Sequence, residues 1–166
     1  VQGNYGEVRD FSYNIRGQLE GINPTYAMTG NKEGESRTFG ESLKYDYGFT
    51  VPRYDGKVAG MIWRGSTAAN NNAYGYRYDH GDQLISADYR KWEPSTSTWR
   101  NDLTDYSVSN LQYDLNGNIQ SMKQRGMRLV NGVSTPVDID NLRYDYETQS
   151  NRLLRVYDTA AIDYST

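Results

Sequence analysis

The sequence YDLNGNI, residues 113–119, decides the fold of this chain. The carboxylate of Asp114 can accept hydrogen bonds from backbone N–H groups two residues further on, which nucleates a turn. Gly117 supplies the positive φ angle that such a turn needs. We therefore expect Tyr113 to end one strand and Ile119 to begin the next, so that the stretch forms a β-hairpin.

The same unit recurs along the chain. It returns as YNIRGQL at residues 13–19 and as YDHGDQL at residues 78–84, where the glycine stands one place earlier. The dipeptide Tyr-Asp occurs six times, beginning at Tyr45, Tyr54, Tyr78, Tyr113, Tyr144 and Tyr157. Such recurrence indicates a repeated supersecondary unit with insertions of variable length. The residues expected to shape its turns are Tyr13, Asn14, Gly17, Tyr54, Asp55, Gly56, Tyr78, Asp79, Tyr113, Asp114, Gly117, Tyr144 and Asp145.

Alternation of apolar and polar residues dominates between these units. Tyr74, Tyr76 and Tyr78 fall on one face of an extended segment, which is typical of a strand with one packed face. Asn131-Gly132 predicts a tight type I′ turn between two strands. The segment 21–41 is expected to be a loop-rich insertion with one short helical turn, because the best helical pattern, Glu33–Leu43, is interrupted by glycines. The chain is thus predicted to be all-β and built from antiparallel hairpins.

Composition supports sheet faces that are only half buried. The chain of 166 residues has 16 Tyr but only 3 Phe and 3 Trp, and tyrosine combines a large ring with a hydroxyl that tolerates water. The net charge of -3 and the lack of a basic cluster argue against nucleic acid and anionic membranes as partners. No apolar run approaches the roughly 20 residues of a membrane span. Cysteine is absent, which excludes disulfides and thiolate chemistry.

The repeated unit resembles the YD repeat of bacterial Rhs/YD-repeat proteins. The similar phrases are Tyr13–Leu19, Leu43–Phe49, Tyr54–Trp63 and Ser107–Asp114, which leads into residues 116–119. The resemblance implies a curved sheet of YD hairpins that forms part of a hollow shell, or β-cocoon. Such shells commonly enclose a toxic C-terminal domain, and relatives serve in insecticidal toxin complexes and in cell-surface adhesion. The implied location is outside the cell or on the bacterial surface.

The resemblance also implies where residues 1–166 belong. The chain has no Asp-Pro motif of the kind found in the conserved core of these proteins, and no trailing cargo domain. We expect it to be a single repeat segment upstream of that core, and a fragment of a larger protein. Its partners would be neighbouring segments of the shell and the enclosed cargo. Because the first and last strands would lack neighbours, we also expect edge-to-edge self-association.

Two tryptophans support an alternative function. Trp92 and Trp99 flank a polar loop, and their indole rings are expected to face each other across the mouth of a hairpin. Exposed aromatic rings can serve as stacking platforms for sugars. The alternative to a shell segment is therefore a cell-surface adhesion or carbohydrate-binding module.

Residues that suggest catalysis or metal binding are isolated. His80, the single histidine, lies in a predicted turn without a companion nucleophile. Asp138 and Asp140 would share one face of a regular strand, as a glycosidase pair does, but no other site chemistry accompanies them. The oxygen-rich stretch that starts at Asp114 resembles the opening of a calcium loop, but its twelfth position is Arg125 where a Glu is needed. We predict no enzyme activity, no metal and no cofactor.

Overall fold

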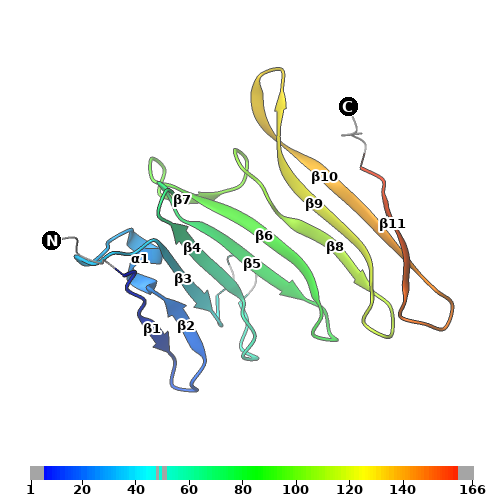
Figure 1. Ribbon diagram of the computed structural model, residues 1–166, viewed down its shortest axis with the longest axis horizontal. Helices are drawn as coiled ribbons and strands as arrows, with labels where there is room; N and C mark the ends of the chain where they lie inside the picture. The colour runs from blue at the N-terminus through cyan, green and yellow to red at the C-terminus, as the bar shows by residue number, and fades with distance from the viewer. Residues whose placement is uncertain (1–5, 48, 50–51, 161–166) are drawn as a thin grey trace. The chain divides into compact units, whose positions relative to one another are not determined.

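The computed structural model describes residues 6–47, 49 and 52–160, and in these residues the chain is all-β with one short helix. The strands form one open antiparallel sheet in the order β1-β2-β3-β4-β5-β6-β8-β9-β10-β11, with β7 paired to β6 (Figure 1). The antiparallel hairpin sheet expected from the sequence is confirmed. The strands are β1 (Phe11–Tyr13), β2 (Leu19–Ile22), β3 (Phe39–Lys44), β4 (Gly60–Gly65), β5 (Asn72–Tyr78), β6 (Leu84–Glu93), β7 (Thr98–Arg100), β8 (Val108–Tyr113), β9 (Ile119–Val130), β10 (Val133–Tyr146) and β11 (Leu153–Asp158).

The chain divides into two compact units. Unit 1 comprises Val1–Gly75 and Arg90–Trp99, and unit 2 comprises Tyr76–Tyr89 and Arg100–Thr166. The dividing points fall inside β5, β6 and β7, so each of these strands contributes to both units.

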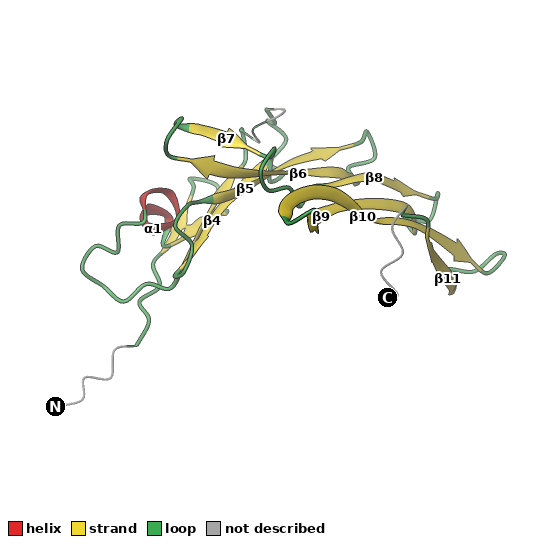
Figure 2. Cartoon of the chain, turned by 90° about the horizontal axis from the view of Figure 1, so that it is seen from above, coloured by secondary structure: helices red, strands yellow, loops and turns green. Residues whose placement is uncertain are grey.

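In unit 1 the helix α1 (Pro24–Thr29) packs on one face of β2, β3 and β4 (Figure 2). Glycine makes the close approach possible, because a Cβ on Gly40 would lie 2.8 Å from the backbone N of Ala27 and 2.8 Å from the carbonyl O of Asn23. Ala27 is fully buried in this contact. The close approach of α1 to β3 therefore depends on a small residue on each side of the contact.

The opposite face of unit 1 carries large side chains. Residues paired directly across an antiparallel ladder project to the same face, and the register places Phe11, Ile22, Glu41, Trp63 and Asn72 in one row across β1 to β5. The same register places Leu43, Met61 and Tyr74 in the next row, and the rings of Trp63 and Tyr74 stack with centroids 5.3 Å apart. This face is thus aromatic and apolar with one carboxylate, and Phe11 remains 54% exposed.

The insertion expected at residues 21–41 is smaller than its predicted bounds. Its ends lie in β2 and β3, and α1 occupies residues 24–29, so the irregular part is the loop of residues 30–38. The helix does not form at Glu33–Leu43, where the helical pattern was strongest. Pro24 at the first turn and Gly30 at the C-cap, with φ 76°, are the local signals that place it at residues 24–29.

Unit 2 is built around the hairpin of β9 and β10. Asn131 and Gly132 form its turn with φ angles of 51° and 79°, and Val130 pairs with Val133, which confirms the predicted tight turn. The pairing shifts register between Asp138 and Asp140, so that Ile139 forms a β-bulge. Ile139 covers Gly126 on the partner strand, where a Cβ would lie 2.7 Å from Ile139 Cδ1.

Candidate functional site

The repeated turns have one common geometry. In each, the side chain of the residue after the tyrosine accepts two backbone N–H bonds, from the second and the fourth residue that follow it. For Asn14 the distances are 2.9 and 3.0 Å, for Asp79 they are 2.8 and 2.9 Å, and for Asp114 they are 2.8 and 2.9 Å. All three side chains thus make the backbone contacts that favour such turns.

The fourth residue after the tyrosine has a positive φ in all three turns. Gly17 has φ 75° and Gly117 has φ 82°, as the sequence predicts. In the turn that carries its glycine one place early, Asp82 takes the left-handed conformation with φ 66°, and Gly81 does not. Backbone geometry is thus fixed by position in the turn, and the displaced glycine does not move it.

A tyrosine hydroxyl links successive strands at the same end of the sheet. Tyr45, Tyr113 and Tyr146 each donate a hydrogen bond of 2.8 Å, to the carbonyl oxygens of Leu19, Leu84 and Ile119 respectively. In every case the acceptor is the first residue of a strand, and the donor ends or directly follows the strand paired with it. We call this contact the tyrosine clamp.

The clamp perturbs the titration of its own groups. Burial, and then the nearby carboxylate of Asp79, raise the pKa of Tyr113 above its ordinary value. Burial is also the main cause that raises the pKa of Tyr146, followed by the charge of Asp114. The pKa of Asp114 is lowered, first by the side-chain hydrogen bond from Asn118 and then by backbone N–H donors. The folded state therefore favours a neutral phenol next to an ionised turn carboxylate.

Neighbouring turns also contact one another through amide side chains. Gln18 Nε2 donates to the carbonyl oxygen of Gly56 at 3.1 Å, within unit 1. In unit 2, Asn116 Nδ2 and Asn118 Nδ2 donate to Asn151 Oδ1 at 3.2 and 2.9 Å. In both units, therefore, an amide on the fifth residue after a repeat tyrosine, Gln18 or Asn118, binds a neighbouring turn.

One of the predicted turn pairs lies inside a strand. Tyr144 and Asp145 are inside β10, so their assignment to a turn is wrong. The turn begins two residues later, at Glu147, whose N–H donates to the carbonyl oxygen of Arg152 at 3.0 Å. Glu147 takes the place of the aspartate and pairs with the Arg152 guanidinium at 2.6 Å.

The stretch Tyr54-Asp55-Gly56 forms a bend between loops. Gly56 has φ 83°, and Asp55 Oδ1 accepts from the Lys57 N–H at 3.1 Å, as in the other turns. Tyr54, however, is 84% exposed and does not lie on the sheet. Tyr54 therefore does not end a strand, as the tyrosine of the repeated unit was expected to do.

The two tryptophans meet as expected. The rings of Trp92 and Trp99 lie with centroids 5.4 Å apart at 66°, and Phe49 contacts Trp99 edge to face at 5.0 Å. The exposed ring of Tyr47 follows at 5.2 Å from Phe49. These four rings form an aromatic cluster in unit 1, in which the indole faces are largely engaged by one another.

The carboxylates considered for catalysis do not form a pair. Because of the bulge at Ile139, Asp138 lies opposite Arg125 and Asp140 lies opposite Gln124, and these adjacent residues project to opposite faces. Asp138 is also held by Lys123 Nζ at 2.7 Å. The possibility that Asp138 and Asp140 share a face is contradicted by this register.

His80, the other residue considered for catalysis, is exposed in the turn after β5, as expected.

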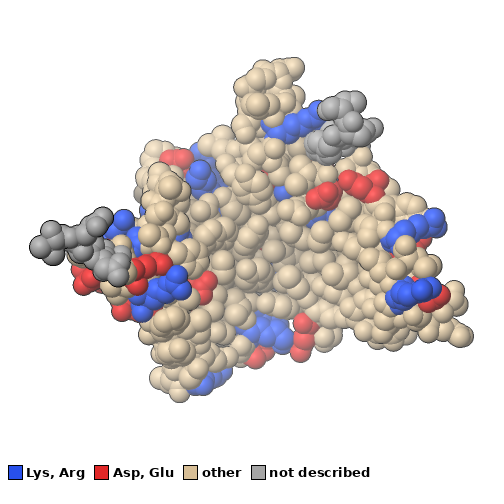
Figure 3. Space-filling model, in the orientation of Figure 1, with Lys and Arg blue, Asp and Glu red and all other residues tan. Residues whose placement is uncertain are grey.

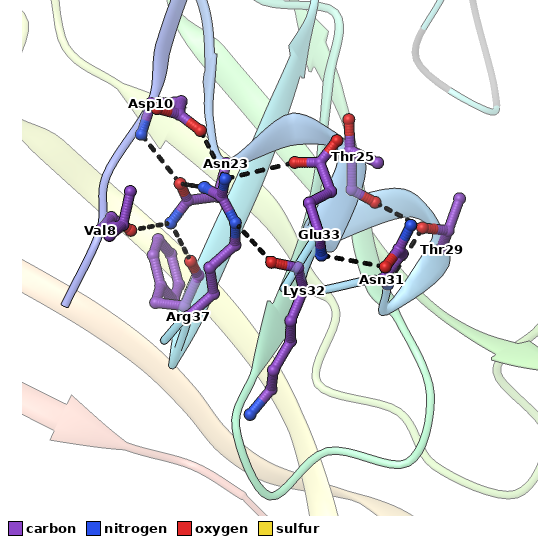
Figure 4. Close-up of polar contacts among 10 residues, drawn as sticks. Val8, Asp10, Asn23, Thr25, Thr29, Asn31, Lys32, Glu33 and Arg37 are labelled. Carbon is purple, nitrogen blue, oxygen red and sulfur yellow. Dashed lines mark hydrogen bonds and ion pairs between the residues drawn. The ribbon is translucent and has the colours of Figure 1, made fainter. Parts of the chain in front are cut away.

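A buried polar network in unit 1 was not foreseen from the sequence. Arg37, only 3% exposed, donates to Asn23 Oδ1, to Asp10 at 2.6 Å and to the carbonyl oxygen of Lys32 at 3.1 Å (Figure 4). Asn23 in turn donates to the carbonyl oxygens of Val8 and Phe39 at 3.2 and 2.8 Å. The network ties the loop after α1 to β3 and to the segment that enters β1, which is a structural role.

A second buried network lies in unit 2. Asp105, 2% exposed, accepts from the N–H and the hydroxyl of Ser107 at 2.9 and 2.6 Å and pairs with Arg125 at 3.2 Å. Ser107 Oγ accepts the backbone N–H of Tyr89 at 2.9 Å. The serine hydroxyl is engaged by the carboxylate itself without an intervening histidine, so the group lacks the base of a hydrolase triad.

A groove in the described part of unit 1 has a volume of about 790 Å³ and is open to solvent. It lies between α1, the turn at residues 13–19 and the bend at Tyr54 and Gly56, and its charged lining residues are of both signs: Arg16, Glu20, Lys44, Asp46 and Arg53. In the part of the chain that the structure describes, no three His, Asp or Glu side chains gather as metal ligands do. Over the same residues, no helix has the length and apolar character needed to cross a membrane.

Comparison with known proteins adds no relative. No protein-family model matches the chain, and no curated protein matches it. The tyrosine clamp and its turns are therefore the main feature from which a function can be argued.

Proposed function

We propose that this chain is a wall segment of a secreted or cell-surface shell of the Rhs/YD-repeat kind, which encloses a C-terminal toxin or another cargo polypeptide. The tyrosine clamp carries this proposal. It recurs at sequence separations of 26, 29 and 27 residues and each time joins one strand to the next at the same end of the sheet. A contact that repeats in this way suits a wall that is extended by adding hairpins.

The faces of the sheet suit the enclosure of a polypeptide. In unit 1 the face opposite α1 combines rings and apolar side chains with Glu41, so it offers many weak contacts. In unit 2, β8 contains no charged residue, and the surface around the middle of this strand is mostly tan, without charged side chains, in Figure 3. Such surfaces can contact an incompletely folded chain without binding one sequence tightly.

We propose that the segment itself catalyses nothing and acts through geometry. Its most buried carboxylate, Asp105, is fully engaged with Ser107 and Arg125, and the pair considered for catalysis lies on opposite faces. The proposed action is to keep proteases and the contents of the producing cell away from the cargo.

The first test is the intact mass of the polypeptide purified from its native source. A mass many times 19.0 kDa, together with limited proteolysis that leaves a protected C-terminal fragment, is the expected result. The same protein with Gly117→Val, which forces a β-branched residue into a left-handed turn, should release that fragment to protease. Gly81→Ala is the matched control and should leave it protected. A native polypeptide of 19.0 kDa without bound cargo would refute the proposal.

The aromatic cluster supports a second candidate, a glycan-binding or adhesion surface. The supporting observation is the exposed ring of Tyr47 at the end of the row that includes Phe49 and Trp99. A glycan array tests this candidate, and binding should be lost in Tyr47→Ala and Trp99→Ala. Tyr54→Ala, which removes an exposed ring outside the cluster, is the control. An array without signal would reject the candidate.

A further inference from the structure

The two outer strands of the sheet each present one half of the tyrosine clamp. Tyr13 ends β1, and its hydroxyl has no acceptor among the described residues, where its side chain is 61% exposed. Leu153 begins β11, and within the described residues no tyrosine hydroxyl donates to its carbonyl oxygen. The donor half and the acceptor half of the contact thus lie at opposite ends of the strand order.

We propose that this chain associates head to tail with a second copy of itself, with β11 of one copy pairing antiparallel to β1 of the next. In this arrangement the Tyr13 hydroxyl of one copy donates to the Leu153 carbonyl oxygen of the other. In the proposed contact β1 provides the donor tyrosine, as β10 does within the chain and as the residue directly after β3 does. β11 provides the acceptor carbonyl, as β2 and β9 do. The association continues an interface already present within the chain, and it does not depend on the cargo proposed above.

The internal clamps fix the register of this contact. Extending the observed pairings places Leu19 opposite Lys44 and Ile119 opposite Asp145, and in both cases the next residue is the clamp tyrosine. The same rule places Leu153 opposite Ser12 of the second copy. It follows that Leu154 lies opposite Phe11, Arg155 opposite Asp10 and Val156 opposite Arg9.

The side chains brought together by this register are complementary. Phe11 and Leu154 are 54% and 57% exposed, and they would form an apolar cross-strand pair. Arg155 and Asp10 carry opposite charges, and both side chains are exposed enough to meet while retaining Asp145 and Arg37 as neighbours. A one-residue change of register would lose both pairings.

The backbone groups of both edges also have the required direction. The N–H of Thr159 donates to the carbonyl oxygen of Asn141 at 2.9 Å, so by alternation the groups of Val156 point away from β10. The N–H of Asn23 donates to the carbonyl oxygen of Asp10 at 2.8 Å, so the groups of Phe11 and Arg9 point away from β2. Val156 and Arg9 can therefore form a hydrogen-bonded pair between copies.

A complementation experiment tests the proposal. Val156→Pro blocks the β11 edge and Phe11→Pro blocks the β1 edge, and neither removes an N–H that bonds within the chain. In sedimentation velocity the unmodified chain should form an open series of oligomers that grows with concentration, because a head-to-tail contact does not close on itself. Each blocked variant should be a monomer when alone, and an equal mixture of the two should form a dimer and nothing larger, because each retains the opposite free edge.

A second, milder pair of variants tests the proposal even if the proline variants fail to fold. Tyr13→Phe removes only the clamp hydroxyl and should weaken association about fivefold, the effect of one hydrogen bond. Tyr54→Phe removes a hydroxyl that is remote from both edges and should have no effect.

Three outcomes would overturn the proposal: a monomer at every concentration, a dimer that persists in one blocked variant alone, or association unchanged by Tyr13→Phe. The last two would indicate a symmetric or unrelated contact. The association concerns residues 1–166 as an isolated chain, because in a longer polypeptide adjoining repeats would fill the same two halves of the clamp. The mass of the native polypeptide, which tests the proposed function, is a separate measurement, so the two ideas are tested independently.

Discussion

Gly117→Ala should destabilise the fold, because Gly117 takes φ 82° in the turn between β8 and β9. The nearest atom to an added Cβ is Gln83 Nε2 at 3.6 Å, so the methyl group has room and the cost is conformational. A left-handed L-residue costs about 1–2 kcal/mol, and the stiffer unfolded chain returns about 0.4–1 kcal/mol of this. We expect the free energy of unfolding to fall by about 1 kcal/mol.

Gly81→Ala is the matched control, since it makes the same chemical change in a turn of the same kind. The φ of Gly81 is not positive, and its added Cβ would lie 3.4 Å from Asp79 Oδ1. This variant should be neutral or more stable by up to about 1 kcal/mol. Urea unfolding of the unmodified chain, Gly117→Ala and Gly81→Ala, compared at equal m-values, measures the difference in their free energies of unfolding. Equal losses in the two variants, or no loss in Gly117→Ala, would refute the assignment of backbone geometry to turn position.

Three further predictions concern the clamp, the helix and pH. Tyr146→Phe should lower the free energy of unfolding by about 1 kcal/mol through loss of the bond to Ile119, measured by urea unfolding against Tyr54→Phe. Gly40→Val should displace α1 from β3, because backbone atoms of the helix lie 2.8 Å from the added Cβ. A melting temperature equal to that of Gly65→Val, whose site is open and whose φ is not positive, would contradict this packing. The pKa values of Tyr113 and Tyr146 are raised on folding, so stability should be complete below pH 10 and decline as pH rises above it. Melting temperatures of the doubly Tyr→Phe variant at Tyr113 and Tyr146 should depend less on alkaline pH than those of the unmodified chain.

Local chemistry made the hairpin turns predictable. Asn14, Asp79 and Asp114 each bond to N–H groups within four residues, and such contacts depend on neighbouring sequence alone. The tight turn at Asn131 and Gly132 was predictable for the same reason. Tyr144-Asp145 misled because a Tyr-Asp pair also fits inside an alternating strand, while the turn itself uses Glu147.

The tyrosine clamp could not be predicted from neighbouring residues, although its tyrosines belong to the repeated unit. Its donors and acceptors are separated by 26 to 29 residues, so they can be recognised only once the strand order is known. The Arg37 network brings Asp10, Asn23 and Lys32 together in the same way. These groups are polar and carry no periodic pattern, so nothing in their spacing indicates that they are buried together.

The sequence alone determined that this chain is a series of antiparallel hairpins, because turn chemistry and alternation act over a few residues. Only the tertiary structure decided the register, and a shift of one residue moves every side chain to the other face. That register separates Asp138 from Asp140 by means of the bulge at Ile139, and it joins each tyrosine clamp across neighbouring strands. Among the described residues it also leaves Tyr13 and Leu153 as the unfilled halves of that clamp, since pairing between distant segments settles which strands have a neighbour on each side.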